Sequence, residues 1–226
     1  MKIVAALWDA DLEGLRSDRF RAGLRDAGVS RLQLNVDDDA IPESALRLQA
    51  FDERLACVLS TWCPASGVDG VLDVLRPVAG RIGAWRVEER IPLPPPEQSD
   101  GDRADALAQV AFLRRPAELP YDEWLGHWHG PHTTIAMETQ ATFGYVQNRV
   151  VAALTDDAPA VDAVVEELFP SAALHDIHAF YGSGGSQAEL DRRITQLLAS
   201  CAVMGADRGL DVVPTSRYVW TLDPRP

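Results

Sequence analysis

Residues 120–151 read PYDEWLGHWHGPHTTIAMETQATFGYVQNRVV, and they contain both a helix-like and a strand-like pattern. It holds three of the five histidines and two of the six tryptophans of the chain. Trp124, Trp128 and His132 are spaced four residues apart, so on a helix they lie along one face. From residue 143 to residue 151 the side chains alternate as they do in a strand. The stretch therefore predicts a helix that leads into a strand.

His132 is the candidate general base of this stretch. A histidine that packs against two tryptophans is partly removed from water, and desolvation disfavours the charged imidazolium. A neutral imidazole at pH 7 is what general-base catalysis requires. The alternative is that His132 is an ordinary hydrogen-bonded residue of the core, because perturbed histidines are also found away from active sites.

The rest of the chain falls into two halves around a proline-rich segment. In residues 1–91 the hydrophobic pattern predicts strands at 2–8, 30–36, 55–62 and 84–93 and helices at 11–27 and 69–82. Residues 92–105 contain four prolines and then acidic residues, and are predicted to be a linker. In residues 106–226 the pattern predicts strands at 106–114, 143–151, 161–169 and 211–222 and helices at 121–140, 171–182 and 189–204.

Each half thus shows the order β-α-β-β-α-β, which is typical of a four-stranded antiparallel sheet with helices on one face. The uncovered faces of two such sheets can be buried if they pack face to face. The predicted fold class is α+β, with two ferredoxin-like repeats that form a barrel-type pseudo-dimer within one chain.

The second half also resembles the EthD domain. The matching positions are Trp124, Trp128, His132, Thr133, the segment YVQN at residues 145–148, Val150 and the segment DAVVEELF at residues 162–169. Two departures are the insertion of His129, Gly130 and Pro131 before His132, and Ala163 in place of glycine. The resemblance implies a dimeric α+β barrel. Relatives in that superfamily include dehydratases, cyclases, decarboxylases and cofactor-independent monooxygenases, and also an accessory protein of ether degradation.

Further site residues follow from the neighbouring strands. Trp124 and Trp128 are expected to wall an apolar pocket. Tyr145 and Asn148 point to opposite faces of one strand, so only one of them can reach this pocket and bind an enolate oxygen. Glu166 is a candidate to orient a histidine. His129 takes the place of His132 as base if Gly130 and Pro131 break the helix.

No metal site and no cofactor are predicted. His127 follows Glu123 by four residues and is interpreted as an exposed surface pair. His129 and His132 lack a third ligand, and no dinucleotide, phosphate-loop or serine-hydrolase motif occurs. The expected function is the binding of a small aromatic or polyketide-like metabolite, with a histidine-dependent lyase or isomerase reaction. A cofactor-independent monooxygenase and a non-catalytic binding protein are the alternatives.

Charge and cysteine content bound the partners and the compartment. The net charge is −13, from 34 acidic and 21 basic residues, and such a field repels nucleic acid and anionic membrane surfaces. Three cysteines without paired spacing favour a reducing compartment. We therefore expect a cytoplasmic protein with a small hydrophobic ligand and neither a nucleic acid nor a membrane partner. A homodimer remains an open alternative.

Overall fold

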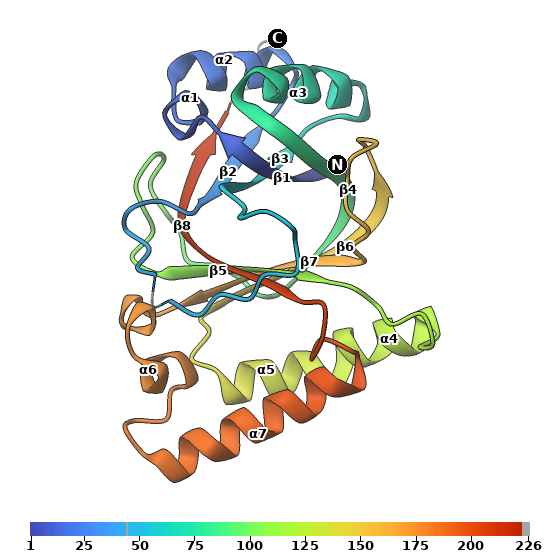
Figure 1. Ribbon diagram of the computed structural model, residues 1–226. Coiled ribbons are helices and arrows are strands. Elements are labelled where there is room, and N and C mark those ends of the chain that lie inside the picture. Colours follow the sequence, from blue (N-terminus) through green and yellow to red (C-terminus); the bar gives the residue numbers. More distant parts are fainter. Residues whose placement is uncertain (44, 223–226) are drawn as a thin grey trace.

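A computed structural model describes residues 1–43 and 45–222 of the chain (Figure 1). The last residues of the predicted second half, 223–226, lie outside the described residues. The strands are β1 (Lys2–Ala10), β2 (Arg31–Val36), β3 (Cys57–Trp62), β4 (Ala79–Leu93), β5 (Leu107–Leu113), β6 (Gly144–Ala153), β7 (Ala163–Phe169) and β8 (Asp211–Thr221). The α-helices are α1 (Leu12–Leu15), α2 (Asp18–Asp26), α3 (Val68–Leu75), α4 (Tyr121–His127), α5 (Thr133–Thr139), α6 (Ile177–Tyr181) and α7 (Gln187–Val203).

The eight strands form one closed antiparallel barrel. Their order around the barrel is β1-β3-β2-β8-β5-β7-β6-β4, and β4 pairs again with β1. The two halves of the chain are joined twice by hydrogen-bonded strands. Leu34 of β2 lies opposite Tyr218 of β8, and Glu88 of β4 lies opposite Arg149 of β6.

This barrel corrects the predicted fold class. The prediction of two ferredoxin-like sheets in a face-to-face pseudo-dimer is wrong, because β2 pairs with β8 and β4 with β6 to make a single continuous sheet. A free four-stranded sheet leaves backbone N–H and C=O groups unpaired at each edge, and closure removes those edges. Hydrophobic alternation locates strands along the chain but does not say which edges pair, so the sequence pattern left this point open.

The helix boundaries show where side-chain caps override the apolar pattern. The predicted helix 11–27 is divided because Ser17 caps α2 by accepting a hydrogen bond from the N–H of Phe20 at 3.1 Å. The helix predicted at 171–182 begins later than expected. Residues 171–174 form a 3₁₀ turn, and Asp176 caps α6.

Helices cover the barrel on two opposite sides (Figure 1). Helices α1, α2 and α3 lie on one side and α4 to α7 on the other, with the barrel between them. One apolar core lies beneath each helix layer, and a third fills part of the barrel interior, where Trp8, Trp85 and Phe112 pack together with Phe51. Strands such as β7 therefore bury both of their faces, one against helices and one inside the barrel, whereas β4 leaves Arg86 and residues 88–91 exposed.

The segment predicted to be a linker runs along β8. Gly101 donates its N–H to Val219 O at 2.9 Å, and Ala104 donates to Arg217 O at 2.9 Å. Whether the chain divides into domains at this segment stays a prediction.

Within residues 1–43 and 45–222, none of the helices combines the length and the apolar character that crossing a membrane requires. The cytoplasmic location stays a prediction.

Candidate active site

A cavity of about 830 Å³ lies between the outer face of the barrel and helices α6 and α7, and residues 128 and 132 also line it. Strands β5 to β8 form its floor, and most of its lining is apolar. Its polar and ionisable lining residues include His132, Tyr145, Glu167 and Cys201. A cavity of this size is in the range that small-molecule sites occupy.

One side of the cavity comes from the first half of the chain. Residues 46 and 48–50 line it, and this segment is held against β8. Leu48 and Val212 exchange backbone hydrogen bonds of 3.0 and 2.8 Å, while Asp211 Oδ1 accepts the N–H groups of Ala50 and Phe51 at 2.7 and 2.8 Å. Residues 106–226 alone therefore do not complete the site.

The predicted helix 121–140 is broken next to the site. Residues 128–132 form a π-helical turn in which Gly130 has φ −101° and ψ −107°, outside the helical region. Gly130 and Pro131 cause this break, since proline lacks an N–H and disfavours helical backbone at the preceding residue. The helix resumes at Thr133 as α5, and His132 stands at its start.

Of the two predicted tryptophan walls, only Trp128 lines the cavity. Trp124 is fully buried, and its ring stacks at a tilt on Trp128 with centroids 5.2 Å apart. The two side chains thus form one aromatic layer, of which Trp128 is the face toward the cavity. Trp124 supports that layer from outside.

His132 lines the cavity and is buried, with 9% of its surface exposed. Burial first, and then charge repulsion from His127, lower its pKa to about 4. The imidazole is therefore neutral at pH 7. Its Nδ1 lies 3.0 Å from Ser200 Oγ on α7, whereas its Nε2 has no hydrogen-bond partner among the described residues.

His127 is a correction to the sequence analysis. Its Nε2 lies 3.1 Å from the Ser200 carbonyl oxygen and 3.2 Å from Ser200 Oγ, so it contacts α7 and does not form an exposed pair with Glu123. A four-residue spacing shows only that two side chains share a helix face. It does not show that this face is open to solvent.

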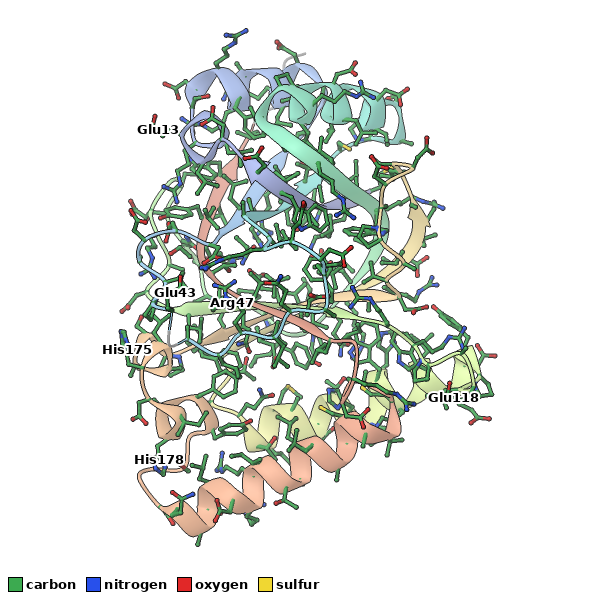
Figure 2. All side chains as sticks on the ribbon, viewed as in Figure 1. Glu13, Glu43, Arg47, Glu118, His175 and His178 are labelled. Carbon is green, nitrogen blue, oxygen red and sulfur yellow. The ribbon has the colours of Figure 1, made fainter. Side chains whose placement is uncertain are left out.

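The other three histidines do not line the cavity. The ring of His129 packs on Trp128 with centroids 4.6 Å apart, and its pKa is lowered by burial and then by the charges of Arg90 and Arg149. Figure 2 shows His175 and His178 on the outer side of the α6 segment. His178 Nδ1 lies 2.6 Å from Ser183 Oγ. The break at Gly130 leaves His132, and not His129, at the cavity.

Strand alternation separates Tyr145 from Asn148. Tyr145 points outward into the cavity, while Asn148 points into the barrel and donates to Val164 O at 3.0 Å. The Tyr145 hydroxyl accepts a hydrogen bond from Gln147 Nε2 at 3.2 Å. Its own proton is then free to be donated to a ligand.

The two adjacent glutamates of β7 face opposite sides of the sheet. Glu166, a predicted site residue, points into the barrel, where its Oε1 accepts from Gln33 at 2.9 Å, Asn35 at 2.8 Å and Arg217 at 3.0 Å. Glu166 therefore forms a buried ion pair with Arg217, and it lies apart from His132. Of these two glutamates, the one whose carboxyl group lines the cavity is Glu167.

Glu167 lies directly opposite Tyr145 in the β6–β7 register, so the two side chains are neighbours on the cavity face. Burial raises the pKa of Glu167 to about 8, since a carboxylate there loses its water. Its Oε1 is buried and has no hydrogen-bond partner among the described residues. The pKa values of Tyr145 and Cys201 are also raised, by burial first and then by the charge of Glu167.

This arrangement supplies acid–base groups and no metal shell. Within the described ranges, no three His, Cys, Asp or Glu side chains are placed to hold a metal ion. What the cavity offers is one carboxyl group whose pKa is close to neutral pH, one phenol and one neutral imidazole. Such a set can remove a proton from a ligand and hydrogen-bond the oxygen that becomes negative.

The fold is shared with a solved structure described as an anthrone oxidase-like protein. The TM-score is 0.54 at 10% sequence identity, over 98% of this chain and 92% of the other. Two structures named "putative monooxygenase", from Lactobacillus acidophilus and Fusobacterium nucleatum, have TM-scores of 0.47 and 0.48 at 10% and 11% identity. The matched regions cover 98% and 96% of this chain, and 95% and 91% of the two other chains.

No family model matches the sequence, and no curated protein does. The resemblance to the EthD domain therefore stays a prediction, and the structural likeness establishes the fold alone.

Proposed function

We propose that the cavity binds a neutral polycyclic phenol or enolisable ketone, and that Glu167 removes a proton from it as the first step of a cofactor-free oxygenation. The observation that carries this proposal is the pairing of Glu167 with Tyr145 on the cavity face. A desolvated carboxylate is a stronger base than an exposed one, and the phenol beside it can donate to the enolate oxygen that proton removal creates.

The pKa of Glu167 suits this role. With a pKa of about 8, roughly a tenth of the side chain is ionised at pH 7, and the carboxylate that forms is far more basic than an exposed one. General-base catalysis is most effective when the pKa of the base lies near the working pH. We therefore propose Glu167 as the base, in place of His132, the candidate that the sequence suggests.

The cavity lining favours an uncharged ligand. Its charged residues are Glu167, Asp207 and Arg208, and Arg208 is an exposed residue that pairs with Glu118 at 2.7 Å. No cation thus faces Glu167 from the cavity lining, and a carboxylate or phosphate on the ligand would be desolvated without a partner. Apolar side chains such as Val165, Phe180 and Leu197 suit flat aromatic rings instead.

The name of the structural neighbour suggests the chemistry to test. Anthrone has a carbonyl group and an acidic CH₂ group in one flat three-ring system. Loss of a CH₂ proton to Glu167 gives the enolate, which reduces O₂ and forms a C–O bond to give a hydroperoxide at that carbon. Loss of water from the hydroperoxide then leaves the quinone. In total, anthrone and O₂ give anthraquinone and H₂O, so neither an external reductant nor a cofactor is required.

Oxygen consumption with anthrone as the probe tests the proposal. We expect the wild-type protein to consume one O₂ per anthraquinone formed, above the rate without protein. Glu167→Gln should lower kcat by about 10²–10⁴-fold, the usual contribution of a general base. Glu123→Gln is the matched control, because it removes an exposed carboxyl group of α4 and should leave turnover unchanged.

Three outcomes would contradict the proposal in different ways. Equal rates for wild type and Glu167→Gln would remove Glu167 from the chemistry. Ligand binding without turnover of any kind would indicate a binding protein. Proton exchange without O₂ consumption would indicate the isomerase or lyase chemistry, which the comparisons do not support.

A further inference from the structure

We infer that His127 and Ser200 are positioning residues that hold His132 as the tautomer with its proton on Nε2, so that His132 donates a hydrogen bond into the cavity. This inference rests on the proposed function for its catalytic meaning. Its structural part can be tested without any substrate.

Three side chains from three elements meet at one hydroxyl group. His127 ends α4, His132 starts α5, and Ser200 lies in the last turns of α7, where only 4% of it is exposed. Ser200 Oγ lies 3.0 Å from His132 Nδ1 and 3.2 Å from His127 Nε2. The imidazole rings of the two histidines do not touch, since their centroids are 6.3 Å apart.

The proton positions follow from the backbone contact. His127 Nε2 is also 3.1 Å from the carbonyl oxygen of Ser200, which can only accept a hydrogen bond. His127 must therefore carry its proton on Nε2 and donate it to α7. The same N–H points near Ser200 Oγ, so that oxygen cannot donate its proton back to His127.

The hydroxyl proton of Ser200 then has one acceptor left. Among the described residues the only partners of Ser200 Oγ are the two histidine nitrogens, and His127 Nε2 already bears a proton. The hydroxyl donates to His132 Nδ1, which must be unprotonated to accept. A neutral imidazole with a bare Nδ1 carries its proton on Nε2.

This tautomer gives His132 a donor role. With Nδ1 held by α7, Nε2–H is the polar group of His132 that remains for a ligand in the cavity. A neutral imidazole can donate to a developing enolate oxygen, just as the hydroxyl of Tyr145 can. His132 with this tautomer cannot accept a proton at Nε2, which is why Glu167 and not His132 is the base.

Two-bond ¹H–¹⁵N NMR of histidine-labelled protein reads the tautomer directly. The His132 signals are assigned from their loss in His132→Gln. In wild type we expect a protonated Nε2 and a bare Nδ1 for His132, and a protonated Nε2 for His127. Ser200→Thr retains the hydroxyl and should keep the pattern. Ser200→Ala should give a mixture of the two His132 tautomers, or move the proton to Nδ1.

A wild-type spectrum with the His132 proton on Nδ1 would overturn the inference, and that result does not depend on any variant folding. An unchanged His132 pattern in Ser200→Ala would overturn the positioning role of Ser200. Circular dichroism establishes that each variant is folded.

The kinetic consequence is a second, separate readout. In the anthrone assay, Ser200→Ala should lower kcat by about tenfold with KM little changed, the effect of misplacing one neutral hydrogen bond. His127→Gln places an amide N–H where Nε2–H was, and should restore most of the activity lost in His127→Ala. If anthrone is not turned over at all, the proposed function fails while the NMR result still decides the tautomer.

Discussion

Replacing Glu167 by glutamine should change how stability depends on pH, because this carboxyl group binds its proton more tightly in the folded chain than in the unfolded chain. Its ordinary pKa is 4.5, and burial raises it to about 8. Below pH 4.5 the group is protonated in both states and makes no difference. Between pH 4.5 and 8 the folded state holds a proton that the unfolded state has released, so stability falls as pH rises.

The size of the effect follows from the two pKa values. Each pH unit between them is worth about 1.4 kcal/mol, so the full loss in wild type is at most about 5 kcal/mol. It is an upper value, because water that enters the cavity screens the charge. His132 has the opposite effect: its pKa is lowered from 6.5 to about 4, so stability rises with pH across that range by about 3 kcal/mol. Below pH 6.5 the opposite effects of His132 and Glu167 therefore partly cancel in wild type, and only the comparison with the variant separates them.

The assay is urea unfolding of wild type and Glu167→Gln at pH values from 4.5 to 9. The free energy of unfolding of the variant minus that of wild type should rise with pH by up to about 1.4 kcal/mol per unit and level off above pH 8. Glu123→Gln, which removes an exposed carboxyl group, should give a nearly flat difference. A flat difference for Glu167→Gln as well would refute the desolvated carboxyl group on which the site depends.

Three further substitutions separate the cavity from its surroundings. Glu166→Ala should cost about 3–5 kcal/mol in chemical unfolding, because it leaves buried Arg217 without its carboxylate, yet any folded fraction should bind anthrone normally. Tyr145→Phe should lower kcat by about 10²-fold or more with little change in thermal stability, and an unchanged kcat would remove the phenol from the reaction. Asp211→Ala should speed hydrogen exchange at residues 46–51, measured by mass spectrometry, since Asp211 holds two of their N–H groups; unaltered exchange would show that other contacts fix this side of the cavity.

Much of the local structure could be predicted from the sequence. The strands at residues 30–36 and 161–169 show clear patterns and are confirmed as β2 and β7. The spacing of Trp128 and His132, together with the alternation at Tyr145, identified three residues that do line one cavity. These features depend on neighbours within a few residues, which a pattern can capture.

Barrel closure and the choice between adjacent glutamates could not be predicted in this way. In β7, Ala163, Val165 and Phe169 face the helices while Val164 and Leu168 face the barrel, so both sides of the strand are apolar. A strand buried on both faces shows no alternation that would assign Glu166 and Glu167 to their sides. Partners that are distant in the sequence assign the two glutamates to their sides, and one of them, Arg217, is 51 residues from Glu166.

The contact between Ser200 and His132 could not be predicted for the same reason. Ser200 lies 68 residues from His132 along the chain, and nothing in the pattern of α7 distinguishes it from any other buried serine. The break at Gly130 and Pro131 was foreseen, but its consequence for His129 and His132 depends on how α4 and α5 pack on α7.

Glu167 is proposed to take a proton from an enolisable ketone that is bound in the cavity. The absorption spectrum of anthrone, bound to excess protein without oxygen and titrated from pH 6 to 9.5, measures this step alone. We predict that wild type produces the enolate spectrum as pH rises through about 8, and that Glu167→Gln binds anthrone but leaves it as the ketone over that range. Identical titrations for the two proteins, both following free anthrone, would contradict the claim.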